Sequence, residues 1–144
     1  MKTKHIPITA ALALGVSVTT SLNARAAALY DYTTIDHPLG VGGTRATGIL
    51  GDSIVGNYTD ASNITHGFLL SGNAYTAIEH PLGAKGTWAS GISDGTIVGY
   101  YQDASSNYHG FLFSGITYTT FDDPSSAHGT FAYGISGSSV VGNS

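Results

Sequence analysis

Two histidines occupy the same place in a repeated pattern and are the side chains best suited to chemistry. His66 and His109 each stand directly before an apolar stretch, and each follows an aspartate, Asp60 or Asp103, by six residues. Imidazole beside a carboxylate can bind a metal ion or transfer a proton. A ring of such ligands for a metal or a sugar, one in each unit, is the functional interpretation. We favour a structural one, in which each His binds a loop backbone or a carboxylate and fixes the end of a strand.

Three carboxylates share one place in the repeat and offer a second kind of chemistry. They are Asp36, Glu79 and Asp122. Glycoside hydrolysis uses two carboxyl groups about 5–9 Å apart, one of them with a raised pKa. Each of these three stands next to a Pro turn, so we expect them to accept backbone N–H groups in the bend rather than to catalyse a reaction.

Other signatures of enzymes and of resident metals are absent from the sequence. It contains no HExxH, GxSxG or P-loop motif, and "SDGTIVG" lacks the Trp of a sialidase Asp-box. Without Cys, no thiolate site can form. His37 and His80 precede prolines, but Asp123 takes that place in the third copy, which argues against a shared metal site. We therefore expect no catalytic residue, no enzyme activity and no cofactor, apart from weak Ca²⁺ binding at the Asp60 or Asp103 loop.

Trp88 is singled out as a speculative ligand contact. The repeated aromatic residues, Phe68 and Phe111 among them, are expected to fill the space between twisted sheets. Trp88, by contrast, stands where the first copy has Arg45 and the third has Phe131. A position that accepts such different large side chains is expected to face a groove or a neighbouring chain, and aromatic faces suit sugar rings.

The elements that must position these residues follow from a gapless repeat of 43 residues. The copies are repeat one at 32–74, repeat two at 75–117 and partial repeat three at 118–144. Aligned positions include Tyr32, Tyr75 and Tyr118, then Pro38, Pro81 and Pro124, and then Gly48, Gly91 and Gly134. Such a register indicates an array of duplicated structural units.

Short strands are the elements that this repeat predicts. Runs rich in β-branched and aromatic residues lie near 32–36, 44–50, 53–59 and 66–71, bounded by Gly, Asp, Asn or Ser, and return 43 residues later. No helical period occurs after residue 30. We predict an all-β fold of repeated four-stranded antiparallel units, arranged as an incomplete β-propeller-like array, with a β-solenoid as the alternative.

The repeat resembles a known family. The pattern "YTTID-P-G…T…GI…G.IVG.Y.D…HGFL.S.G", from about residue 30 to the end, is similar to the HAF repeat of bacterial extracellular proteins, with His-Gly-Phe in place of His-Ala-Phe. The resemblance implies secretion and a repeat architecture. It implies no particular activity.

The first 28 residues read as a secretory signal peptide. "MKTKH" is positively charged, an apolar run follows, and "NARAAA" offers cleavage after Ala26 or Ala28. The mature repeat domain, 29–144, would keep Arg45 and Lys85 against nine acidic residues, a formal net charge near −7. An acidic surface disfavours nucleic acid and, after cleavage, membrane partners. We therefore expect a periplasmic or extracellular protein.

The function predicted from these observations is that of a secreted, non-catalytic binding or scaffolding module. Its extracellular ligand, a carbohydrate or a protein, is not specified by the sequence. Two copies and part of a third cannot close a propeller, so we expect either a truncated member of its family or a homo-oligomer. The alternative functions are a fragment of a secreted propeller enzyme and a carbohydrate-binding lectin that closes its ring by oligomerisation.

Overall fold

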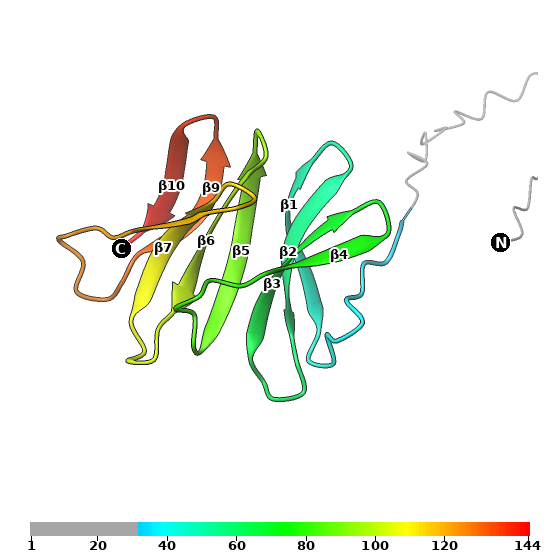
Figure 1. Ribbon diagram of the computed structural model, residues 1–144, viewed down its shortest axis with the longest axis horizontal. Helices are drawn as coiled ribbons and strands as arrows, with labels where there is room; N and C mark the ends of the chain where they lie inside the picture. The colour runs from blue at the N-terminus through cyan, green and yellow to red at the C-terminus, as the bar shows by residue number, and fades with distance from the viewer. Residues whose placement is uncertain (1–31) are drawn as a thin grey trace, which may run out of the picture. The chain divides into compact units, whose positions relative to one another are not determined.

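Strands and turns make up the described part of the chain. A computed structural model describes residues 32–144 (Figure 1), so the predicted signal peptide lies outside the described residues. From residue 32 onward there is no helix, which confirms the all-β prediction. Within the same range no helix is long and apolar enough to cross a membrane. Residues 33–144 form one compact unit.

Ten strands follow one another along this unit and are joined by short turns and loops. They are β1 (Thr44–Leu50), β2 (Ser53–Thr59), β3 (Thr65–Ser71), β4 (Ala74–Ile78), β5 (Gly86–Ser93), β6 (Thr96–Gln102), β7 (Tyr108–Phe113), β8 (Tyr118–Phe121), β9 (Phe131–Ser136) and β10 (Ser139–Asn143).

The strands form two antiparallel units of four and a final pair. In the first unit β1 to β4 pair in chain order, and in the second unit β5 to β8 do the same. The hairpin of β9 and β10 begins a third. A single parallel bridge, between Thr65 and Gly86, joins β3 to β5. The strands predicted near 44–50, 53–59 and 66–71 are therefore confirmed, as are their copies in the second unit.

The strand predicted at 32–36 was wrong. Residues 32–37 have no regular structure, and Tyr32 is 91% exposed. The segments that correspond to 32–36 in the next two copies do form strands, β4 and β8. Each is the last strand of its unit and pairs with the strand just before it, β3 or β7. No such strand precedes residue 32 within the described range. A hydrogen-bonded unit therefore begins one strand later than the sequence repeat.

Repeated glycines allow the strands within a unit to approach closely. A Cβ on Gly99 of β6 would lie 1.9 Å from the Trp88 carbonyl oxygen and 2.9 Å from the Phe111 ring. Phe111 is fully buried beneath this strand. Its counterpart Phe68 is likewise fully buried, against Gly56 of β2. The register of β5 against β6 shifts between Ala89 and Gly91, which marks a bulge opposite this contact.

The first strand of each unit packs against the preceding unit. β5 contacts β1, β2 and β3, and β9 contacts β5 and β6. A Cβ on Gly91 would lie 3.3 Å from the Gly134 Cα, so β5 and β9 meet backbone to backbone. Between the first two units, the Thr47 hydroxyl donates to the Ala89 carbonyl oxygen (2.8 Å) and the Asn57 Oδ1 accepts from the Ala89 N–H (2.7 Å).

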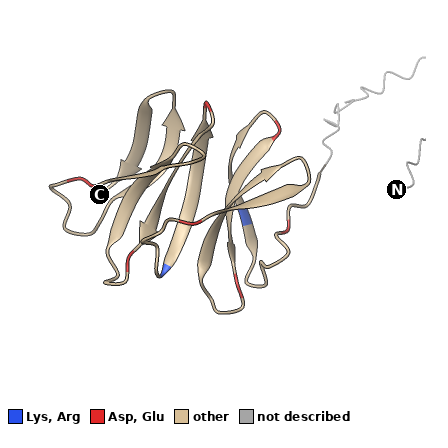
Figure 2. Ribbon diagram, viewed as in Figure 1, with Lys and Arg blue, Asp and Glu red and all other residues tan. Residues whose placement is uncertain are grey.

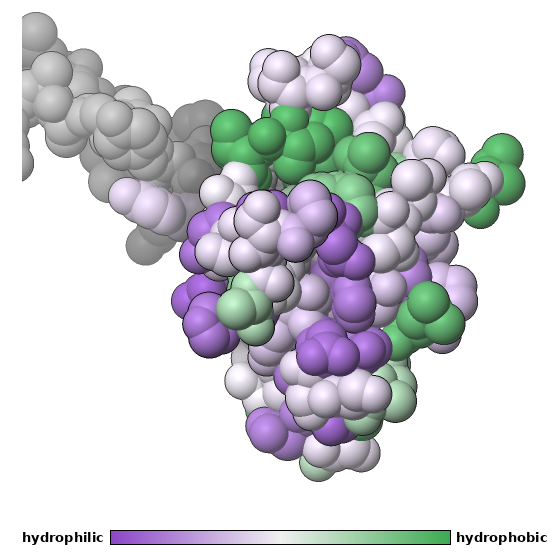
Figure 3. Space-filling model, turned by 90° about the vertical axis from the view of Figure 1, so that its left-hand side faces the viewer, coloured by the Kyte–Doolittle hydropathy of each residue, from purple (hydrophilic) through white to green (hydrophobic). Residues whose placement is uncertain are grey.

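Equivalent side chains differ in exposure according to what covers them. Val55 and Val98 are fully buried, whereas Val141 of β10 is 65% exposed. Ile49 of β1 is 68% exposed, whereas its counterpart Ile92 packs against the buried core. Figure 3 views the molecule from the side of β9 and β10 and shows apolar side chains gathered on that surface. Neighbouring units therefore add burial that the outermost strands lack.

We expect Gly99→Ala to lower the free energy of unfolding by about 1–3 kcal/mol, because the new methyl group would overlap a backbone carbonyl oxygen. Gly134→Ala is the matched control, since its Cβ would meet only a Val141 methyl group at 3.2 Å. Urea unfolding measures both. A Gly99→Ala variant as stable as Gly134→Ala would contradict the close approach.

Candidate functional site

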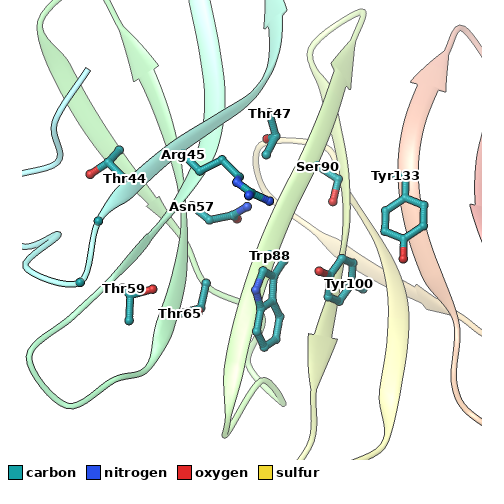
Figure 4. Close-up of a pocket in the computed structure, with 12 residues that line it drawn as sticks. Thr44, Arg45, Thr47, Asn57, Thr59, Thr65, Trp88, Ser90, Tyr100 and Tyr133 are labelled. Carbon is teal, nitrogen blue, oxygen red and sulfur yellow. The ribbon is translucent and has the colours of Figure 1, made fainter. Parts of the chain in front are cut away.

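A groove of about 600 Å³ runs along the boundary between the first and second units. Figure 4 shows the side chains that line it, from β1, β2 and β3 of the first unit and from β5, β6 and β9 of the units that follow. The larger and more polar of them are Arg45, Asn57, Trp88, Ser90, Tyr100 and Tyr133. Glycine and threonine complete the wall, and no aliphatic side chain larger than Thr is among the lining residues. Its volume lies within the range of small-molecule sites.

Strand pairing explains why these side chains meet. Arg45 of β1 lies opposite Asn57 of β2, and Trp88 of β5 lies opposite Tyr100 of β6. Directly opposed residues of an antiparallel pair project from the same face of the sheet. The two pairs are repeat counterparts, so each unit presents its own version of one cross-strand pair to the boundary.

Aromatic rings form one side of the groove. The rings of Trp88 and Tyr100 are stacked, with centroids 5.1 Å apart and planes 12° from parallel. The Tyr133 ring stands edge-on to Tyr100, at 6.1 Å and 89°. Burial, followed by the neighbouring Tyr133 and Tyr108 hydroxyls, raises the pKa of Tyr100, while Arg45 lowers it. The Tyr100 hydroxyl therefore stays protonated near neutral pH and can donate a hydrogen bond.

One cation faces these rings. In Figure 4, Arg45 extends from β1 toward β5, the strand that carries Trp88. Among residues 32–144, no carboxylate forms a salt bridge with Arg45, and the groove lining contains neither Asp nor Glu. Figure 2 shows the acidic residues at turns and strand ends instead. The groove is thus a locally positive place on an acidic protein.

His66 lies between two carboxylates, outside this groove. Its Nε2 is 3.2 Å from Asp60 Oδ2, and its Nδ1 is 2.7 Å from Glu79 Oε1. Its ring also stacks on Tyr58, with centroids 5.1 Å apart. Asp60 in turn accepts backbone N–H groups of its own loop, from Ser62 and Ile64. The ring therefore links the loop after β2 to the end of β4.

His109 repeats this arrangement in the second unit. Its Nε2 is 3.4 Å from Asp103 Oδ2, and its Nδ1 is 3.0 Å from Asp122 Oδ2. Burial alone would lower the pKa of His109, but the bonds to Asp122 and Asp103 together raise it above the usual value. An imidazole ring can donate to two carboxylates at once only when both nitrogens are protonated. These contacts accord with a structural role for both histidines, which stays a prediction.

Two of the three repeated carboxylates do not cap a bend, contrary to expectation. Glu79 and Asp122 instead bind His66 and His109, and burial is the main cause that raises the pKa of Glu79. Sequence distance hides this pairing, because His and carboxylate are 13 residues apart and meet through the antiparallel pairing of neighbouring strands. Asp36 has no such partner in the described range, since no strand precedes it there.

The residues before the prolines have a shared local role. The Nδ1 atoms of His37 and His80 accept the N–H two residues later, each at 3.2 Å, and Asp123 Oδ1 accepts the equivalent N–H at 2.8 Å. These contacts hold the turns that contain Pro38, Pro81 and Pro124. An acceptor at this distance is all the turn needs, so Asp can replace His. Burial is the main cause that lowers the pKa of His37 and His80. Charge repulsion lowers it further, from His66 in the first unit and from His109 in the second.

The loops considered for Ca²⁺ have few free oxygens. Asp103 Oδ1 accepts from the Asn107 N–H, and its Oδ2 accepts from the Asn107 and His109 side chains. Within residues 32–144, no group of three or more His, Asp or Glu side chains is arranged to hold a metal ion. Calcium would have to displace these bonds, and weak binding there stays an untested expectation.

The site thus includes one residue that the sequence pointed to and several that it did not. Trp88 lies in the groove, whereas Arg45 was noted only as its counterpart, and Asn57, Tyr100 and Tyr133 were not considered as ligand contacts. The sequence did contain a signal for these residues, namely variation between the copies. Positions 45, 47 and 57 change side-chain class between copies, while the alanine at positions 46, 89 and 132 is constant.

Comparisons with known proteins leave the function to be argued from this geometry. No protein-family model, curated protein or solved structure matches the chain.

The raised pKa of His109 predicts a pH-dependent contribution to stability. Protonation favours the folded state, so the contribution is complete below the unfolded pKa of about 6.5 and is lost as the pH rises through the folded pKa. We expect His109→Gln to lower the unfolding free energy by about 1 kcal/mol at about pH 5.5 and by much less at about pH 9. Urea unfolding across that range measures this.

His128→Gln is the control for this comparison, since His128 is exposed and has no carboxylate partner within the described chain. Its effect should be small at every pH. A His109→Gln effect that is constant, or that grows toward pH 9, would show that the two carboxylates do not favour the charged ring.

Proposed function

We propose that this chain is a non-catalytic binding module and that its ligand occupies the groove between the first two units. One observation carries the proposal. At most of the positions that line this boundary the copies differ from one another, and there they place rings, hydroxyl groups and a cation around a cavity of small-molecule size. The shared positions suffice to build the repeat, so the side chains that vary at this boundary can serve a ligand instead.

A binding role is favoured over catalysis by where the titratable groups lie. The carboxylates nearest to acid–base chemistry, Glu79 and Asp122, are engaged by histidines, and neither lines the groove. The groove's own polar groups are hydroxyls, an amide and a guanidinium, which bind ligands well but are poor general bases near neutral pH.

The finer architecture belongs to the same proposal. We take the four-stranded units to be blades of a propeller-like array of HAF-type repeats. Support comes from the packing of β5 and β9 against the units before them and from the repeated close approach at glycine. In such an array the first strands and their neighbours flank a shared surface, and the groove lies there.

Export is the remaining part of the proposal and rests on the charged, apolar and small-residue segments of positions 1–28. We expect the exported protein to begin at Ala27 or Leu29. Terminal sequencing of the secreted chain would show this, and a mature chain that keeps Met1 would contradict it.

Trp88 provides the test of the binding site, because it is the only Trp in the chain. We expect a ligand from a panel of neutral and acidic oligosaccharides and oligopeptides to change its fluorescence, without itself being cleaved. The control is Trp88→Phe, which gives the second unit the residue that the third unit has at this position. We expect calorimetry to show that this variant binds the same ligand more weakly. A panel with no binding member, or cleavage of a bound one, would contradict the proposal.

A further inference from the structure

We infer that the ligand of the groove is an acidic saccharide, held by its carboxylate on Arg45 and by a sugar ring on Trp88. This inference rests on the proposed function and adds the chemical class of the ligand. It follows from three features of the groove: its charge, its hydrogen-bonding groups and the kind of apolar surface that it offers.

Charge is the first feature. Arg45 and Lys85 are the only Lys or Arg residues from position 32 onward, and Arg45 stands in the groove. No acidic side chain lines that cavity, although the same stretch of chain carries acidic residues at many of its turns. A guanidinium without a carboxylate partner can bind one from a ligand through two parallel N–H bonds.

Hydrogen-bonding groups are the second feature. The Asn57 Oδ1 already accepts the Ala89 N–H, which directs the other end of this amide away from that backbone contact. No residue of the described chain accepts a hydrogen bond from the Asn57 Nδ2, and the atom is not buried. With the hydroxyls of Ser90 and Tyr133, it offers donors and acceptors for a ligand rich in hydroxyl groups.

The apolar surface is the third feature, and it separates a saccharide from a peptide. The groove contains aromatic rings but no Leu, Ile, Val or Met. Aliphatic side chains of a peptide therefore find no matching pocket, whereas the C–H face of a sugar can lie on an indole ring. Trp88 and Tyr100 are stacked nearly parallel, so they present a flat, supported platform of this kind.

The test compares two trisaccharides that differ only at C6 of each sugar residue. α-1,4-linked trigalacturonate carries carboxylates, and α-1,4-linked galactotriose carries neutral CH₂OH groups in their place. We expect calorimetry at low salt to give an affinity at least about 10-fold higher for trigalacturonate. In Arg45→Gln this preference should disappear. Arg45 is exposed, so circular dichroism should show an unchanged fold.

Lys85→Gln is the matched control, because it removes the same charge from a position outside the groove lining. It should change the affinity for trigalacturonate less than about 2-fold. Equal binding of both trisaccharides, or equal losses in Arg45→Gln and Lys85→Gln, would overturn the carboxylate anchor and leave the groove as a saccharide site. Failure of both trisaccharides to bind would overturn the inference, whereas the proposed function fails only if no member of the wider panel affects Trp88.

Discussion

The close approach between the first strands of successive units is the constraint on which the rest of this structure depends. A Cβ on Gly48 would lie 3.2 Å from the Gly91 Cα, and one on Gly91 would lie 3.3 Å from the Gly134 Cα. A side chain on Gly48 or Gly91 would press on the backbone of the next unit, so glycine at these two positions allows the strands to approach this closely. The strand β5 meets β1 at the first of these contacts and β9 at the second. The side chains that flank each glycine are therefore brought to the boundary between units.

The constant and the variable residues of the repeat have different roles. Constant residues close each unit, and among them His66 with its two carboxylates joins a loop to the last strand. His37, Tyr58 and His66 form one stack of rings, which returns as His80, Tyr101 and His109. Variable residues, such as Arg45 and Trp88, face the groove. Some variable residues also join units, since Thr47 and Asn57 both hydrogen-bond to the Ala89 backbone of the next unit.

Local patterns in the sequence predicted most of the strands, because each short strand carries its own β-branched residues and its own turns. The exception at 32–36 has a physical reason: an edge strand needs a partner, and pairing is not a local property. The link between His66 and Glu79 was missed for the same reason. Trp88 was found because its variation between copies is visible in one sequence, whereas its partner Tyr100 becomes evident only from the cross-strand register.

The central claim is that the boundary between two units, held by the glycine contacts, forms a site for an acidic sugar. A crystal structure of the chain bound to trigalacturonate tests it most directly. We expect a sugar ring on the Trp88 indole and a ligand carboxylate within hydrogen-bond distance of the Arg45 guanidinium. A trisaccharide bound away from this groove, or bound in it with no carboxylate near Arg45, would contradict the account.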